Sequence, residues 1–164
     1  MVEGHFLFGV IDYKEIMNHQ EKAAKLFESG YNCAQAVAGA FSDVTGIGLE
    51  QSCKLVSGYG GGMGRMREVC GAVSGMVFVL SVLYGYDTPN PEAQKQIYER
   101  VQTVAGKFRE EAGSIICREL LNQPATDPTP TPRDAAFYAK RPCTRFVMLA
   151  AKVLDEHIRG QSEK

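Results

Sequence analysis

Apolar side chains recur every three to four residues along most of the chain, which is the spacing that lines one face of an α-helix. The pattern is clearest over residues 91–121, where the apolar positions are Ile97, Val101, Val104, Ala105, Phe108, Ala112, Ile115 and Ile116. No segment alternates apolar and polar residues in the way that predicts a half-buried β-strand. The pattern therefore predicts an all-α protein.

The same spacing predicts further helices on either side of that segment, over residues 11–29, 33–44, 49–57 and 142–158. Gly30 suits the position that follows the first of these helices, because glycine tolerates a left-handed backbone there. Asn32 suits the N-cap of the next helix, since its side chain can accept from the first free N–H groups. Pro142 fits the first turn of the last helix, so any helical turn before it should be separate.

The most apolar run of the chain covers residues 69–84 and follows a glycine-rich stretch containing Gly60, Gly61, Gly62 and Gly64. The run falls short of the roughly 20 residues that span a bilayer. We expect a buried central helix over about 68–84, entered from a glycine-rich loop. Clustered glycines indicate left-handed backbone or a close approach between segments, because glycine is entropically costly to order.

A chain of 164 residues is long enough for one domain with a substantial core. We expect a loosely held leader over residues 1–10 and a single-domain bundle of about five to six helices over 11–164. Residues 122–133 carry four prolines and should form an extended connection within that domain.

The net charge of −1 gives no electrostatic reason to expect nucleic acid or an anionic membrane as a partner. The first residues also lack the basic segment, apolar run and small-residue cleavage site of a secretory signal. We therefore expect a cytoplasmic protein. A homodimer is compatible with a small helical fold, although no exposed apolar stripe requires one.

Five cysteines are the main candidates for chemistry, and in a reducing compartment cysteines bind metals or act in catalysis more often than they form structural disulfides. They are Cys33, Cys53, Cys70, Cys117 and Cys143. No Cys-x-x-Cys pair is present, so a functional cluster must come from different helices. Three of them, Cys33, Cys70 and Cys143, fall in the first turns of predicted helices, which favours the thiolate. The plain alternative is that cysteine packs as a small buried hydrophobe.

Arg65 and Arg67 follow the glycine-rich loop and could hold an anionic substrate or balance the charge of clustered thiolates. Two solvated loop arginines are the alternative. The loop lacks the Gly-Lys-Ser/Thr ending of a Walker A motif and the strand that precedes a dinucleotide fingerprint. His5, His19 and His157 are scattered among polar residues, and we expect them at the surface without a role.

The chain resembles the redox-active family named for its cysteine pattern, C_GCAxxG_C_C. The resemblance covers about residues 23–154 and rests on the segments 30–37, 60–64 and 70–75, followed by two isolated cysteines. It implies a small helical protein near oxidoreductase or transporter systems, with no established reaction. The family's four recurrent cysteines correspond to Cys33, Cys70, Cys117 and Cys143, which leaves Cys53 as a structural residue.

The family also resembles the helical part of split-Soret cytochromes, which join such a domain to c-type haem and are thought to hold an iron–sulfur centre. This chain lacks the Cys-x-x-Cys-His motif of c-type haem, so only the cysteine cluster carries over. Four thiolates are the standard number of ligands for an iron–sulfur cluster or a structural zinc ion. An iron–sulfur cluster or another thiolate-bound metal is therefore the implied cofactor.

These observations lead to a redox hypothesis in two versions. In the first, Cys33, Cys70, Cys117 and Cys143 hold a metal centre beside the loop of Gly60, Gly61, Gly62 and Gly64 with Arg65 and Arg67, and the protein carries electrons or delivers metal. In the second, two of the cysteines form a reversible disulfide, with Cys70 as the attacking thiolate. The alternative is a non-catalytic module that binds a small anion at the loop while its cysteines only pack. Whether the protein is an enzyme, and which redox partner it meets, stay open.

Overall fold

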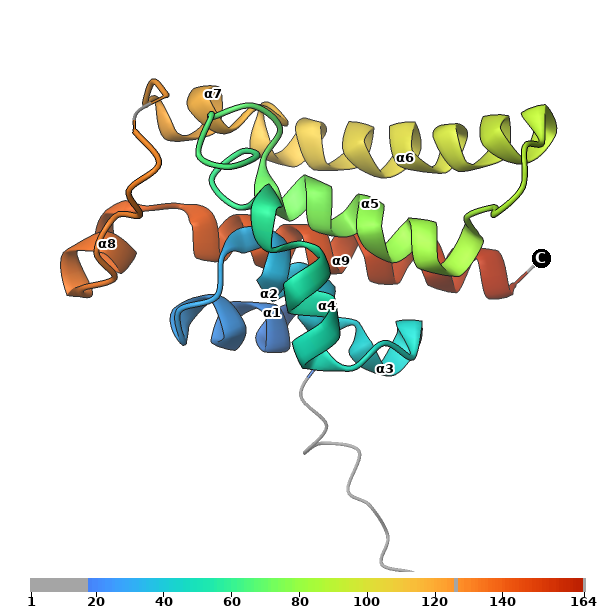
Figure 1. The fold of residues 1–164 in the computed structure, drawn as a ribbon, viewed down its shortest axis with the longest axis horizontal. Coiled ribbons are helices and arrows are strands. Elements are labelled where there is room, and N and C mark those ends of the chain that lie inside the picture. Colours follow the sequence, from blue (N-terminus) through green and yellow to red (C-terminus); the bar gives the residue numbers. More distant parts are fainter. Residues whose placement is uncertain (1–17, 126, 164) are drawn as a thin grey trace, which may run out of the picture.

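The computed structural model describes residues 18–125 and 127–163 of the chain (Figure 1). Within that part, every regular element is helical and no strand is present. The all-α prediction is confirmed. The expected leader over residues 1–10, and residues 11–17 of the first expected helix, lie outside the described residues.

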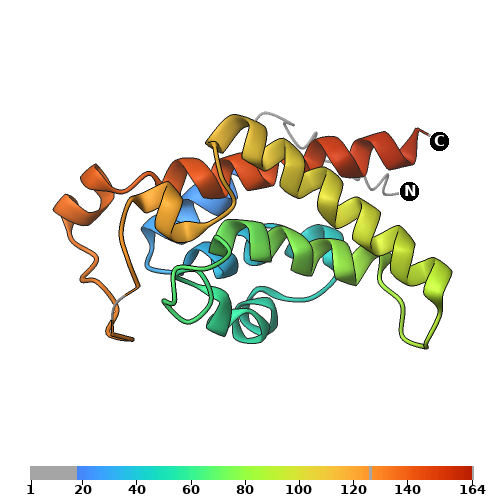
Figure 2. The same ribbon diagram turned by 90° about the horizontal axis from the view of Figure 1, so that it is seen from above.

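Five longer helices form a bundle, as expected. They are α1 (His19–Glu28), α2 (Cys33–Ala40), α5 (Gly71–Tyr84), α6 (Pro91–Ala112) and α9 (Cys143–Ser162). Helix α9 packs along α1, and α2 packs against both α1 and α5. Helix α6 lies against α5 and α9 on the other side (Figures 1 and 2).

Shorter helical segments connect these five. They are α3 (Ser42–Thr45), α4 (Leu49–Leu55), a 3₁₀ turn (Ser57–Tyr59), α7 (Cys117–Leu121) and α8 (Ala135–Lys140). The helix predicted over residues 33–44 is broken at Phe41, where the backbone leaves the helical conformation and the ring is fully buried. Gly46 then ends α3 in a left-handed conformation, with φ of 74°.

The helix predicted over residues 91–121 is wrong in its last part. Helix α6 ends at Ala112 because Gly113 adopts a left-handed conformation, with φ of 94°, and its N–H caps the carbonyl of Arg109. The chain turns there and begins α7 at Cys117. Cys117 therefore opens a short helix of its own, whereas the apolar period placed it near the end of a long one.

The C-terminal part follows the proline-based prediction. Helix α8 is separate from α9, and Pro142 occupies the position just before the first residue of α9. Helix α9 continues to Ser162, four residues beyond the predicted end at 158. No helix of residues 18–125 and 127–163 combines the length and the apolar character needed to cross a bilayer.

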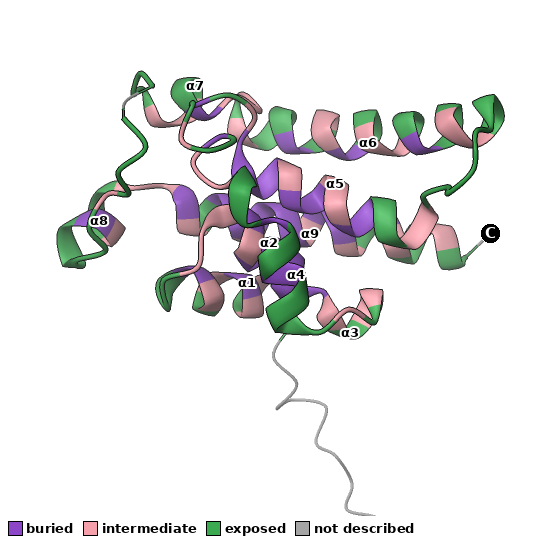
Figure 3. Ribbon diagram, viewed as in Figure 1, coloured by how far each residue is buried: buried purple, intermediate pink, exposed green. Residues whose placement is uncertain are grey.

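The core is concentrated between α2, α5 and α9 (Figure 3). Helix α5 is buried over much of its circumference, and its side chains Met76, Val79 and Leu80 have almost no solvent exposure. Gly75 allows α2 and α5 to approach closely, because a Cβ atom there would lie 2.8 Å from the Cβ atom of Val37. The buried central helix predicted from the sequence is therefore present.

Candidate functional site

Four of the five cysteines line a single cavity of about 340 Å³. They are Cys33 at the start of α2, Cys70 just before α5, Cys117 at the start of α7 and Cys143 at the start of α9. The glycine-rich loop, α7 and the start of α9 lie at the same end of the bundle in both views (Figures 1 and 2). The fold thus brings together four cysteines that are far apart in the sequence.

Short backbone pairing holds Cys70 beside Cys117. Residues Val69 and Ile116 form an isolated antiparallel bridge. The N–H of Cys70 donates to the carbonyl of Ile115 at 2.8 Å, and the N–H of Cys117 donates to the carbonyl of Glu68 at 2.6 Å. Because both hydrogen bonds use backbone atoms, this pairing fixes the two cysteine positions independently of their side chains.

A capping box holds Cys33 at the first position of α2. The Asn32 side chain accepts from the N–H of Gln35 at 2.9 Å, and the Gln35 side chain accepts from the N–H of Asn32 at 3.1 Å. The Asn32 amide also donates to the carbonyl of Ser57 at 3.0 Å. The predicted N-cap is present, and it ties the start of α2 to the segment before the glycine-rich loop.

The glycine-rich loop is a run of left-handed backbone that closes against the cysteines. Positive φ values occur at Gly61, Gly62, Met63, Gly64, Arg65 and Arg67. A Cβ atom on Gly62 would lie 2.6 Å from the Cβ atom of Cys117, and one on Gly71 would lie 3.0 Å from the Cβ atom of Cys33. The glycines therefore serve close approach as well as backbone freedom. All four predicted loop glycines, Gly60, Gly61, Gly62 and Gly64, line the cavity.

Arg67 is one of the least exposed polar residues, with 2% of its surface accessible, so the alternative of a solvated loop arginine is wrong for this residue. It lines the cavity, and its Nη1 donates to Sγ of Cys117 at 3.7 Å. Its Nε is buried and has no hydrogen-bond partner among the described residues. Arg65 also lines the cavity, and it donates to the carbonyl of Asp127 and to Oγ1 of Thr131, both at 2.9 Å.

Two further arginines at the cavity were not singled out from the sequence. Arg141 donates to Oγ1 of Thr131 at 3.1 Å, and Arg133 donates to the carbonyl of Tyr31 at 3.2 Å and lies over the Phe27 ring. No aspartate or glutamate is among the described residues that line the cavity. The position of Arg141, two residues before Cys143, is the one sequence signal that could have indicated it.

Each of Cys33 and Cys143 is the largest influence on the pKa of the other. The Cys33 side chain lowers the pKa of Cys143 to about 7, and the positive charges of Arg141, Arg133 and Arg67 act in the same direction. The Cys143 side chain, together with the partial burial of Cys33, raises the pKa of Cys33 well above its usual value. Of the two thiols, Cys143 therefore ionises more readily.

The other two cavity cysteines favour the neutral thiol. Burial raises the pKa of Cys70 to about 12, and the backbone N–H groups of Ala72 and Val73 only partly oppose it. Burial also raises the pKa of Cys117, against the effect of Arg67. The raised pKa disfavours Cys70 as the attacking thiolate expected from the sequence, because loss of solvation outweighs the benefit of a helix start. Among the three cysteines at predicted helix starts, Cys143 alone has a lowered pKa.

Cys53 lies apart from the cavity, in α4. It is buried, and its thiol donates a weak hydrogen bond to the carbonyl of Gln35 at 3.9 Å. Burial raises its pKa. These contacts agree with the structural role expected for it.

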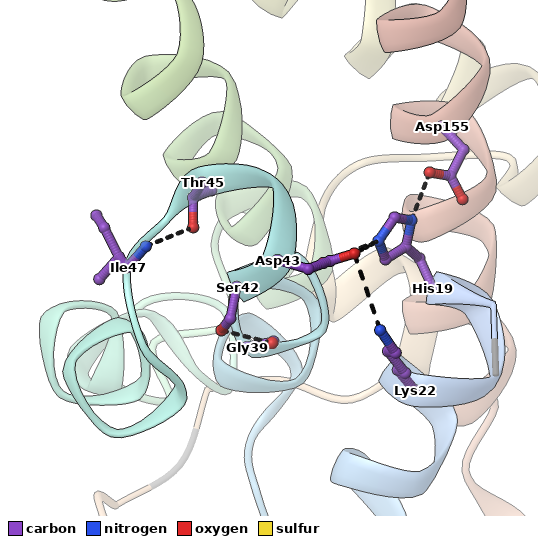
Figure 4. A network of polar contacts seen from close by, with 8 residues as sticks. All are labelled: His19, Lys22, Gly39, Ser42, Asp43, Thr45, Ile47 and Asp155. Carbon is purple, nitrogen blue, oxygen red and sulfur yellow. Dashed lines mark hydrogen bonds and ion pairs between the residues drawn. The ribbon is translucent and has the colours of Figure 1, made fainter. Parts of the chain in front are cut away.

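The surface position expected for the histidines is wrong for His157, whereas His19 is partly exposed. The ring of His19 stacks on Phe41 and lies between two carboxylates, with Nδ1 2.6 Å from Asp155 and Nε2 3.0 Å from Asp43 (Figure 4). His157 is buried, and its Nε2 lies 3.3 Å from Nη1 of Arg100. His5 lies outside the described residues.

The cysteine cluster does not form a site for a single metal ion. Among the described residues, no three His, Cys, Asp or Glu side chains are close enough together to hold one. All five cysteines are free thiols. The donor set suits either thiol–disulfide chemistry or a polynuclear cluster, whose several metal atoms spread their cysteine ligands over a wider space.

Comparison with known proteins gives a family. Residues 31–157 match the family model described as "Putative redox-active protein (C_GCAxxG_C_C)". The match covers most of the chain and includes all four cavity cysteines, so the chain belongs to the C_GCAxxG_C_C family. No curated protein and no solved structure matches this chain.

Proposed function

We propose that this protein is a dithiol–disulfide redox protein whose reactive pair is Cys33 and Cys143. The placement of these two side chains on one cavity, where each is the largest influence on the pKa of the other, is the observation that carries the proposal. Oxidation of the Cys143 thiolate and the Cys33 thiol removes two electrons and one proton from the pair and brings the sulfurs to the covalent separation of about 2.05 Å. Reduction by a partner dithiol reverses the step.

The two cysteines have different roles in this proposal. The Cys143 thiolate is the nucleophile, since thiolates rather than thiols attack disulfide sulfur. Arg141 and Arg67 stabilise it through their positive charges. Cys33 keeps its proton until the first sulfur–sulfur bond has formed, and then loses it as its own sulfur attacks Cys143.

Mass mapping of the oxidised protein tests the proposal. The reduced full-length protein is treated with excess oxidised dithiothreitol, the free thiols are alkylated, and the peptides are identified. We expect a Cys33–Cys143 disulfide that dithiothreitol reverses. Cys33→Ser and Cys143→Ser should abolish it, whereas the matched control Cys53→Ser should retain it because Cys53 lies outside the cavity. Five free thiols after oxidation, or a different pair, would contradict the proposal.

An iron–sulfur cluster is the second candidate, and the four cysteines on one cavity favour it. Their number is the usual one for a [2Fe–2S] or [4Fe–4S] cluster, and Cys33, Cys70, Cys117 and Cys143 would hold it. A bound cluster would supply one-electron transfer. The glycine-rich loop leaves no room for a larger side chain at Gly62, because a Cβ atom there would lie 2.6 Å from the Cβ atom of Cys117.

Anaerobic purification with iron and sulfide assays and a visible spectrum tests this second candidate. We expect loss of iron on substitution of any one cavity cysteine by serine, and full retention in Cys53→Ser. A colourless protein free of iron and sulfide, prepared from iron-supplied cells, rejects the cluster and leaves the dithiol.

The proposed cellular setting follows from the thiols. Free cysteines with redox chemistry suit a reducing cytoplasmic compartment, where a partner dithiol can regenerate the reduced pair. A homodimer is compatible with the fold, and light scattering at two protein concentrations would detect it. We expect no change in the thiol chemistry on dilution, because all four cavity cysteines belong to one chain.

A further inference from the structure

We propose that the oxidant of this protein is a small disulfide that bears carboxylates. Arg67 and Arg141 bind these carboxylates in the cavity and so select the oxidant. The inference rests on the Cys33–Cys143 redox pair proposed above. It adds the chemical class of the substrate and the residues that recognise it.

The unpartnered nitrogen of Arg67 is the first observation. Arg67 is almost completely buried and lines the cavity, yet its Nε has no hydrogen-bond partner among the described residues. Leaving a buried charged donor unpaired is costly, and native structures rarely do so without a functional reason. A ligand carboxylate in the cavity would supply the missing acceptor, and its planar shape matches a guanidinium group.

The charge balance of the cavity is the second observation. Arg65, Arg67, Arg133 and Arg141 line the cavity, and no acidic residue is among the described residues that line it. Arg65 lies near the Asp127 carboxylate, since its positive charge is one of the causes that lower the pKa of Asp127, after the hydrogen bonds of Thr129. Arg67, Arg133 and Arg141 instead donate to a thiol, backbone carbonyls, an amide and a hydroxyl. The excess positive charge of the cavity therefore belongs to these three arginines.

The remaining walls of the cavity suit a short carbon chain. Leu120, Leu121 and Phe146 line it together with the cysteines. A cavity of about 340 Å³ is in the range of small-molecule sites, which are mostly apolar with a few fixed polar groups. A small disulfide has the required parts: an apolar chain, a central sulfur pair for Cys143 and an acidic end for the arginines.

The reaction balances with this oxidant alone. The Cys143 thiolate attacks one sulfur of R–S–S–R, forming Cys143–S–S–R and releasing the first half as a thiolate. The Cys33 thiol then gives its proton to the released thiolate and attacks Sγ of Cys143, which forms the Cys33–Cys143 bond and releases the second half as a thiolate. The protein pair loses two electrons and one proton, and the small disulfide gains them as one thiol and one thiolate.

Three disulfides of similar size and different charge test the inference. The reduced full-length protein is mixed at low ionic strength with dithiodiglycolate, bis(2-hydroxyethyl) disulfide or cystamine, which are anionic, neutral and cationic. Rates of free-thiol loss are divided by those of N-acetylcysteine with the same reagent. We expect the anionic reagent to exceed the neutral one by about tenfold or more, with cystamine slowest, because charge-assisted hydrogen bonds form only to the carboxylate.

Arginine variants assign the preference to residues. Arg141→Gln and Arg67→Gln should each remove most of the anionic preference while the neutral reagent still forms the Cys33–Cys143 disulfide. Circular dichroism reports whether the buried Arg67 variant is folded, since the rate with the neutral reagent also depends on the charge of Arg67 beside Cys143. Arg109→Gln is the matched control, since it removes one positive charge from an exposed position of α6 away from the cavity. It should keep the full preference.

The outcomes separate the two proposals. Equal normalised rates for the three reagents, with a Cys33–Cys143 disulfide formed by each, overturn the substrate class and leave the redox pair standing. A preference that survives in both Arg67→Gln and Arg141→Gln overturns the assignment of these arginines. Failure of every reagent to form the Cys33–Cys143 disulfide overturns the redox pair and the inference with it.

Discussion

At the scale of single residues, reactivity is decided by which thiol keeps its proton. Each of Cys33 and Cys143 is the largest influence on the pKa of the other, and the surrounding arginines favour negative charge on Cys143. Cys70 lies in the same cavity but is buried without a comparable partner, and burial holds its pKa at about 12. The lowered pKa of Cys143 therefore results from its neighbours and not from its position at a helix start.

The pH dependence of alkylation follows from this arrangement. In the reduced, metal-free protein, the alkylation rate at Cys143 should rise with pH and reach half its maximum near pH 7, because the reactive thiolate forms above that pH. Peptide mapping after brief iodoacetamide treatment measures the rate at each site.

Removing the Cys33 side chain should raise the pKa of Cys143. Cys33→Ala removes the largest cause of the lowered pKa, so the midpoint for Cys143 should move upward toward the ordinary thiol pKa. Cys53→Ala should leave the midpoint unchanged. An unchanged midpoint in Cys33→Ala would mean that the arginines alone set the reactivity of Cys143.

At the scale of helices, the site depends on close contact between α2 and α5. Cys33 opens α2 and Cys70 precedes α5, so the distance between these helices also sets the separation of their cysteines. Gly75 and the alanines of α2 permit the contact, since larger side chains would push the helices apart. Packing of small residues in the bundle is thus a condition for the geometry of the cavity.

A pair of glycine substitutions tests this contact. Gly75→Ala should lower the free energy of unfolding by about 1 to 3 kcal/mol, because its Cβ atom would lie 2.8 Å from that of Val37 and 3.0 Å from the carbonyl oxygen of Ala34. Gly106→Ala in α6 meets no atom within 4 Å and should raise the free energy of unfolding by about 0.5 to 1 kcal/mol.

Urea unfolding followed by circular dichroism measures both changes. The two variants add the same methyl group to a helix interior, so helix propensity favours both equally. A stabilising effect of Gly75→Ala would show that α2 and α5 can separate at little cost. Close packing of these helices would then not fix the separation of their cysteines.

At the scale of the whole molecule, His19 joins three separate helices. It belongs to α1, and its ring contacts Asp43 of α3 and Asp155 of α9 (Figure 4). The hydrogen bond to Asp155 is the largest cause that raises the pKa of His19, and burial opposes it. Protonation of this one residue therefore strengthens the packing of the first helix on the rest of the bundle.

The free energy of unfolding should fall as the pH rises above 6.5, because His19 loses its proton. Since the folded pKa of His19 lies above the ordinary value of 6.5, its stabilising effect is complete below pH 6.5 and is lost as pH rises through the folded pKa. Urea midpoints measured from pH 6 to 9 should fall over that window. His19→Gln should flatten the curve there, and an unchanged slope would exclude His19 as the cause.

His157 should act with the opposite sign and in a different window. Burial, followed by the charge of Arg100, lowers the pKa of His157, so the folded protein favours its neutral form. Its effect is complete above pH 6.5 and is lost as pH falls through the folded pKa. Urea midpoints should therefore fall again below pH 6.5, and His157→Gln should reduce that fall without altering the alkaline window.

The sequence by itself determined the fold class, most of the helices and the identity of the cavity cysteines. Apolar spacing, the Asn32 cap and Pro142 act over a few residues, so their effects can be predicted without knowing distant contacts. The same local reasoning went wrong at Gly113, because a left-handed turn ended the helix where the apolar period continued.

The tertiary structure alone decided which residues meet and which thiol has a lowered pKa. Cys33 and Cys143 are 110 positions apart, yet they line one cavity together with Arg133 and Arg141. The pKa of each thiol depends on burial and on the charges around it, which no local pattern contains. Local propensity therefore set the helices, whereas long-range packing placed Cys33 and the arginines where they lower the pKa of Cys143.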